Sequence, residues 1–191
     1  MDCGSRRNTA APKGLLLIED CLDADGGIAL PPGTTLISLI ERNVANVGNA
    51  VAYRYLDYAR AEGHAVEVTW AQFGVRLRAI GAQVQKFAGD GDRVAILAPQ
   101  GIDYVAGFYA AVKAGTISVP LFAPELPGHA ERLETALRDS DPTAVLTTAA
   151  AKDAVESFLA NLLDLRRPHL IVIDQIPDSA GEQFVPVESG I

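Results

Sequence analysis

Apolar residues recur at every third or fourth position between residues 69 and 88, a spacing typical of an amphipathic helix that faces a core. The stripe consists of Phe73, Leu77, Ile80, Val84 and Phe87, and the side chains expected in solvent are Arg76, Arg78, Gln83 and Lys86. Thr69 and Gln72 have the spacing of a capping box. We therefore expect the helix to begin directly after Thr69.

The chain before this helix is predicted to contain another helix and a hairpin. One helical face would be formed by Leu36, Ile40, Val44 and Val47. Residues 52–56 and 65–69 are rich in aromatic and β-branched side chains, and a polar segment separates them. This arrangement predicts a β-hairpin.

Beyond residue 89, short apolar runs alternate with helical patterns. The runs are 94–97, 116–122, 144–147 and 170–173, and the helix after the first run would turn Val105, Phe108, Tyr109 and Val112 inward. Uninterrupted apolar strands are buried on both faces, so the order predicts an α/β fold with an open, mainly parallel, doubly wound sheet and helices on both faces. Pro120 lacks an amide N–H, which restricts its strand to an edge or to the strand's end.

The same patterns divide the chain into three parts. Residues 15–176 would form one α/β subdomain, which includes the N-terminal helix and the hairpin. Residues 1–14 are small, polar and basic, and we expect them to form a disordered leader. Residues 177–191 contain repeated proline and glycine, and we expect a linker or a truncated end there.

Composition excludes several classes of protein. The chain has 24 Asp+Glu against 16 Lys+Arg and a net charge of −8, which argues against nucleic-acid binding. Two cysteines among 191 residues are too few for a disulfide scaffold and favour the reducing cytoplasm. No stretch approaches the roughly 18 apolar residues of a membrane span.

Candidate chemistry is sparse. Open parallel sheets bind ligands at the carboxyl ends of their strands, where Gln100, Phe122 and His129 are the substrate-side candidates. A turn role for Gln100 and a loop or capping role for His129 are the favoured alternatives. Asp103 is expected to complement the dipole of its helix. Dinucleotide, phosphate-loop, zinc and serine-nucleophile motifs are absent, so we assign no catalytic residue and no metal ligand.

Two segments resemble the core motifs of adenylate-forming enzymes. Val68–Phe73 is similar to the first motif, a hydrophobic-Thr-Tyr/Trp-x-Glu/Gln-Leu/Phe pattern that opens a helix, and Val112–Leu121 is similar to the second, K-A-G-x-x-x-V-P-L. We expect the motif residues to be structural: Thr69, Trp70, Gln72, Phe73, Lys113, Ala114, Gly115, Val119, Pro120 and Leu121.

Within that superfamily, the chain most resembles the fatty-acid–AMP ligases of mycobacteria and related actinobacteria. The resemblance rests on Val51–Asp57, Ala98–Tyr104, Pro120–His129 and Ala144–Thr148, and it extends from about residue 28 to residue 175. It implies the partial N-terminal domain of an enzyme that uses ATP and Mg²⁺ to activate a long-chain fatty acid as an acyl-adenylate. The acceptor it implies is the acyl carrier protein of a polyketide synthase.

The chain also departs from that family. Nothing in it matches the Gly- and Ser/Thr-rich phosphate loop, the ribose-binding aspartate or the catalytic lysine. We therefore expect roughly the first third of a ligase, which is inactive alone and binds neither ATP nor Mg²⁺ tightly. Two alternatives remain open. One is a piece of a long-chain acyl-CoA synthetase, and the other is a non-catalytic module that binds a partner or self-associates through an uncovered edge and face of the sheet.

Overall fold

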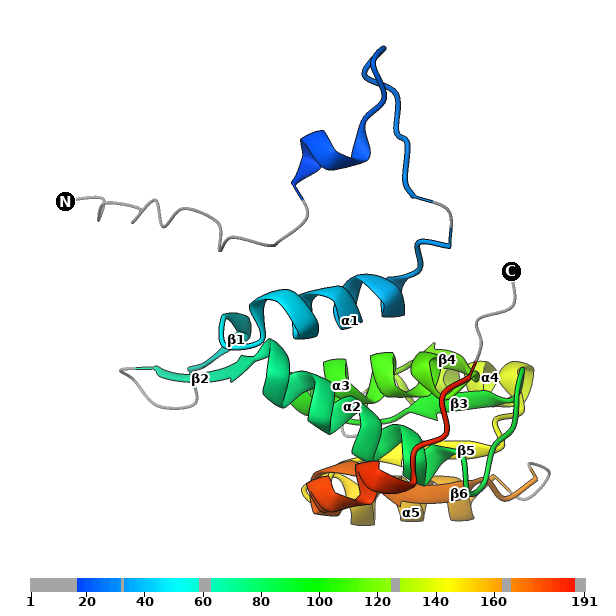
Figure 1. Cartoon of the computed structure of the whole chain (residues 1–191). Coiled ribbons are helices and arrows are strands. Elements are labelled where there is room, and N and C mark those ends of the chain that lie inside the picture. Colours follow the sequence, from blue (N-terminus) through cyan, green and yellow to red (C-terminus); the bar gives the residue numbers. More distant parts are fainter. Residues whose placement is uncertain (1–16, 32, 59–62, 125–127, 163–165, 188–191) are drawn as a thin grey trace, which may run out of the picture.

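The computed structural model describes residues 17–31, 33–58, 63–124, 128–162 and 166–187. The expected leader at residues 1–14 lies outside these ranges. The first described segment contains a 3₁₀ turn, η1 (Ile18–Cys21), and stands away from the rest of the molecule (Figure 1). Helix α1 (Leu36–Val47) follows, and a reciprocal pair of hydrogen bonds between Thr35 and Ser38 caps its N-terminus.

The expected hairpin is confirmed. Strand β1 (Val51–Asp57) pairs antiparallel with β2 (His64–Thr69), and an ion pair of 2.5 Å joins Arg54 to Glu67 across the two strands. The base of the hairpin packs against the core through Tyr53, whose ring centroid lies 4.9 Å from that of Phe73.

The sheet is parallel, as expected. Its strands are β3 (Arg93–Ile96), β4 (Ile117–Pro120), β5 (Ala144–Thr147) and β6 (His169–Val172), in the order β4-β3-β5-β6. Pro120 is the last residue of edge strand β4, so its missing amide costs the sheet no hydrogen bond.

Helices cover both faces of this sheet. Helices α2 (Trp70–Val84) and α3 (Ile102–Lys113) share a core with Val94 and Ile96 of β3. Helices α4 (Ala130–Ser140) and α5 (Lys152–Ala160) share another with Ala95 and Leu97. The doubly wound fold is confirmed. Both faces of the central strands β3 and β5 are covered, contrary to the expectation of an uncovered face, whereas edge strand β4 is partly exposed, with Ile117 at 53%.

Helix α3 turns a different face to the core than the sequence pattern predicted. Its fully buried positions are the small residues Ala106, Gly107, Ala110 and Ala111, while Val105, Phe108 and Tyr109 are partly buried at the margin of the core. The helix lies too close to the sheet for large side chains. A Cβ at Gly107 would already lie 3.4 Å from the side chains of both Leu146 and Ile173.

Two expectations around α2 are also wrong. Phe87 lies beyond the end of the helix, is 38% exposed and stacks on His169 with ring centroids 4.5 Å apart. Residues 178–183, expected to lack a defined element, form a 3₁₀ helix, η3 (Asp178–Gln183), that packs along α2. Gly81 permits this approach, because a Cβ there would lie 2.8 Å from the ring of Phe184. None of the helices in the described ranges is both long and apolar enough to cross a bilayer.

Candidate functional site at the carboxyl edge of the sheet

All four strands of the sheet point the same way, so their carboxyl ends meet along one edge. Hydrogen bonds tie neighbouring strand ends together. The Thr147 hydroxyl donates to the Leu97 carbonyl at 2.8 Å, and the Tyr104 hydroxyl donates to the Leu121 carbonyl at 2.7 Å. The amide of Ala149 donates to both carboxylate oxygens of Asp174, at 2.8 and 3.1 Å. The edge is therefore a fixed surface rather than a set of independent loops.

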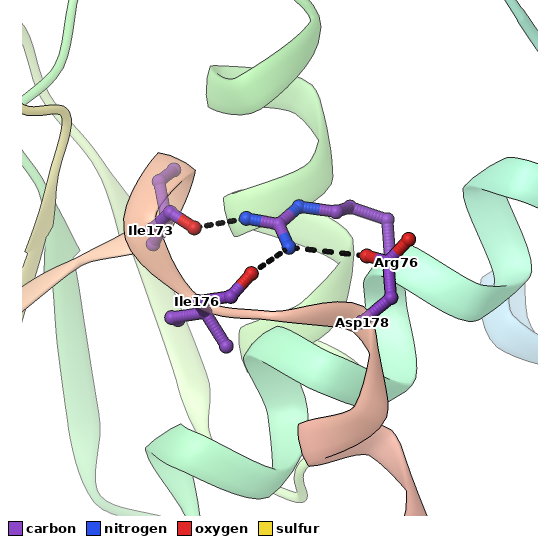
Figure 2. A network of polar contacts seen from close by, with 4 residues as sticks. All are labelled: Arg76, Ile173, Ile176 and Asp178. Carbon is purple, nitrogen blue, oxygen red and sulfur yellow. Dashed lines mark hydrogen bonds and ion pairs between the residues drawn. The ribbon is translucent and has the colours of Figure 1, made fainter.

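Arg76 of α2 anchors the segment that follows β6 (Figure 2). Its guanidinium donates to the carbonyl of Ile173, in the 3₁₀ turn η2 (Ile173–Gln175), and to that of Ile176 at 2.5 Å. Asp178 completes the network with an oxygen 3.3 Å from the guanidinium. The Arg76 side chain is only 19% exposed, so its predicted place in solvent is wrong.

Asp103 lies in the first turn of α3, as expected, and in an environment that disfavours its charge. Burial raises the pKa of this carboxyl above its ordinary value, and the nearby Asp174 carboxylate raises it further, while Arg76 acts in the opposite direction. Two carboxylates and one guanidinium that is already hydrogen-bonded thus give this part of the edge a negative character.

Replacing Asp103 with asparagine is expected to stabilise the protein at pH 7 by less than about 1 kcal/mol, because the half-exposed carboxylate is screened by solvent. The raised pKa means that wild-type stability falls as the pH rises through the unfolded-state pKa and then the higher folded-state pKa. The advantage of Asp103→Asn should therefore disappear in acid, where both states of the wild type are protonated. Urea unfolding at pH 3, 5 and 7 measures this. An equal effect at all three values would contradict it.

The structure brings two of the three substrate-side candidates together, and the third contacts Tyr104. The rings of Phe122 and His129 meet edge to face, with centroids 5.5 Å apart. His129 is the N-cap residue of α4, but its side chain makes no capping hydrogen bond. Gln100 is exposed and hydrogen-bonds to the Tyr104 side chain, which lowers the pKa of Tyr104 against a larger rise from burial. A substrate role for all three stays a prediction.

The sequence pattern placed Thr148 and Asp174 at the carboxyl ends of their strands but assigned them no role, and it missed Arg76 at this edge. Thr148 is 8% exposed, and its hydroxyl makes no hydrogen bond to any described residue. A signal for Arg76 was present, because it lies three residues after Phe73 and four before Ile80, within the buried stripe of α2. For Thr148 and Asp174 the predicted strand ends gave the position, but no sequence signal indicated their contacts, which depend on strand order.

The ionisable groups described at this edge are mainly carboxyls. Among the described residues, no group of three or more His, Cys, Asp or Glu side chains is placed to hold a metal ion. The guanidinium of Arg76 is occupied by two carbonyls and Asp178, and the neighbouring ionisable groups among the described residues are the carboxyls of Asp103 and Asp174.

The first sequence motif shapes the start of α2. The amide of Gln72 donates to the Thr69 hydroxyl at 3.3 Å, and the amide of Thr69 donates to the Gln72 side chain at 2.9 Å, which confirms the capping box. Phe73 is fully buried, and Trp70 packs against it with ring centroids 6.5 Å apart. These contacts lie in the first turn of α2 and in the main core.

The second motif forms the turn from α3 to β4. Lys113, in the last turn of α3, forms an ion pair with Glu41 of α1, and Ala114 is the C-cap residue. Gly115 has φ +86°, a left-handed conformation that glycine adopts without strain. Its carbonyl accepts a hydrogen bond of 3.0 Å from the amide of Gly91. Val119, Pro120 and Leu121 then lead along edge strand β4 to the carboxyl edge.

The first motif lies at the start of α2 and the second at the α3–β4 turn. Together with the doubly wound α/β fold, they are typical of adenylate-forming enzymes. The chain belongs to the AMP-binding enzyme family, whose pattern matches residues 40–189.

Within this family, the chain is similar to enzymes of mycobacteria. The chain is 41% identical over 162 residues to long-chain-fatty-acid–AMP ligase FadD32 of Mycolicibacterium smegmatis, an alignment that covers 84% of this chain and 26% of the relative. It is 33% identical over 157 residues to 4-hydroxyphenylalkanoate adenylyltransferase of Mycobacterium tuberculosis, covering 80% of this chain and 25% of the relative. The chain thus spans about a quarter of the length of these relatives.

A solved structure supports the fold. The fatty acid AMP ligase from Legionella pneumophila superposes on the chain with a TM-score of 0.70 and 23% identity, over 81% of this chain and 26% of that one.

Proposed function

We propose that this chain supplies the N-terminal α/β part of a fatty-acid–AMP ligase, which joins a long-chain fatty acid to AMP at the expense of ATP. The observation that carries the proposal is the 41% identity to a long-chain-fatty-acid–AMP ligase over 84% of the chain. The structure supports a scaffold role, because the first family motif caps α2 and the second shapes the turn from α3 to β4.

The substrate side of the proposal concerns the carboxyl edge. We assign Gln100, Phe122 and His129 to the side that faces the carboxylic acid, since ligands of open parallel sheets bind at this edge. Mg²⁺ as the metal and the acyl carrier protein of a polyketide synthase as the acceptor are further parts of the proposal. The proposal also includes a cytoplasmic location, which the low cysteine content supports.

A chimeric ligase tests this proposal. Residues 17–187 of this chain would replace the aligned segment of the M. smegmatis ligase, with the unmodified ligase as the positive control. We expect fatty-acid-dependent pyrophosphate release from the chimera and only background from the isolated chain. Either a folded chimera that is inactive with fatty acids, or release from the isolated chain at the rate of the intact ligase, would contradict the proposal.

A long-chain acyl-CoA synthetase is the second enzyme candidate, because it contains the same two core motifs. The acceptor distinguishes the two. Thioester formation on a phosphopantetheinylated carrier protein supports the ligase, whereas thioester formation with coenzyme A supports the synthetase.

A partner-binding module is the non-enzymatic candidate, and the hairpin favours it. Tyr55, Leu56 and Val66 on β1 and β2 are 39%, 48% and 43% exposed, which leaves apolar surface at the tip of an isolated two-stranded sheet. Light scattering after size exclusion measures association. A monomer supports the scaffold role, and a dimer that Tyr55→Ser and Val66→Ser disrupt supports the module.

A further inference from the structure

A pocket separate from the carboxyl edge lies between α1 and α2. Its volume is about 240 Å³, and its apolar lining consists of Ile37, Ile40, Val44 and Leu77. Lys113, at the C-terminal end of α3, also lines it. Since α3 begins at the carboxyl edge and is 12 residues long, the two places are roughly 16–18 Å apart along that helix.

The packing of α1 on α2 fixes the shape of this pocket. Gly74 of α2 lies directly against Val44, and a Cβ at Gly74 would be 2.8 Å from a methyl carbon of that valine. Ile40 is 6% exposed and Leu77 is 1% exposed, so both are held by the main core. The apolar lining therefore exists in the folded protein and does not have to be formed by a ligand.

The charged side chains that line this pocket carry a net charge of +1, although the chain as a whole carries −8. Two cations, Arg78 and Lys113, line it, together with a single carboxylate, Glu41. Lys113 is 10% exposed, is paired with Glu41 and lies 5.2 Å from the ring centroid of Phe184. Arg78 is exposed and forms no ion pair within the described part of the chain. The uncompensated charge is thus that of Arg78.

We propose that this pocket binds an anionic amphiphile, a fatty carboxylate of medium chain length. The hydrocarbon would lie on the apolar lining, and Arg78 would pair with the carboxylate at the exposed rim. The volume is below the roughly 300–1,000 Å³ of pockets for drug-sized ligands, which fits a medium chain better than a long one. This site is distinct from the substrate side of the proposed ligase and does not depend on it.

Decanoate is the probe, and titration calorimetry on the full 191-residue chain is the measurement. We expect saturable binding of one decanoate, and much weaker binding of decyltrimethylammonium, which has the opposite charge. Arg78→Glu should weaken decanoate binding by about tenfold. Ala45→Phe should abolish it, because the exposed Ala45 lines the pocket and a ring there would fill the space.

Matched variants distinguish binding in this pocket from binding elsewhere on the chain. Asn46→Phe adds the same ring at the next exposed position of α1, outside the pocket lining, and should leave binding unchanged. Phe122→Ala, at the carboxyl edge, should also leave it unchanged. Circular dichroism confirms that each variant folds.

Four results would overturn the proposal: no saturable binding, equal binding of the cationic probe, decanoate binding that survives Ala45→Phe, or loss of binding in Phe122→Ala alone. Loss of binding in Phe122→Ala alone would place the ligand at the carboxyl edge, which rejects the α1–α2 site while supporting the proposed function. Inactivity of the chimeric ligase, in contrast, has no bearing on this titration.

Discussion

Replacing Phe73 with alanine is expected to lower the free energy of unfolding by about 3–5 kcal/mol. The side chain is fully buried and is surrounded by the rings of Tyr53, Trp70 and Tyr109, with centroids 4.9, 6.5 and 6.1 Å away. These rings come from the hairpin, from α2 and from α3. Removing Phe73 therefore leaves a cavity at the junction of three elements, which cannot all move inward to fill it. Urea unfolding monitored by circular dichroism measures the loss.

Phe87→Ala is the matched control, because the sequence pattern predicted the same buried environment for both phenylalanines. The structure leaves Phe87 38% exposed, in contact with His169. Its replacement should therefore cost about 1 kcal/mol or less. Similar losses for the two variants would show that the packing of α2 described above is incorrect.

Arg76→Ala is expected to lower the free energy of unfolding by about 2–4 kcal/mol, because it removes charged hydrogen bonds and leaves two carbonyls without their donor. The loss should be localised. Amide hydrogen exchange is expected to accelerate first in residues 173–183, which Arg76 fastens to α2, and only later in the strands of the sheet.

Arg78→Ala controls for the loss of an arginine from the same helix. Its side chain is exposed, so the expected change in unfolding free energy is within about 0.5 kcal/mol. Arg76→Lys adds a further comparison, since an ammonium is a point charge and lacks the planar fork of the guanidinium. Unchanged exchange of residues 173–183 in Arg76→Ala would mean that other contacts hold this segment.

Local signals in the sequence predicted much of the fold. The capping box at Thr69 and Gln72 is an interaction within one turn, and the structure contains it. The four parallel strands and the edge position of Pro120 followed from short apolar runs and from the missing amide. The face of α3 did not follow, because the close approach of the helix to the sheet reverses the usual preference for large buried side chains.

The candidate site was less predictable because it is assembled from distant parts of the chain. Asp174 contributes to the raised pKa of Asp103 although 70 intervening residues separate them, and Arg76 bonds to carbonyls 97 and 100 residues away. A charged residue inside the apolar stripe of α2 was a usable clue for Arg76. The pairing of Phe122 with His129 had no such clue, since it depends on where α4 begins relative to the end of β4.

The strand order has a consequence for how this sheet can grow. One edge strand is β4, where Pro120 has no amide N–H that could bond to an additional strand. The other edge strand is β6, whose residues 169–172 include no proline. Among the described strands, none occupies the outer side of β6. An additional strand would therefore pair more readily with β6 than with β4.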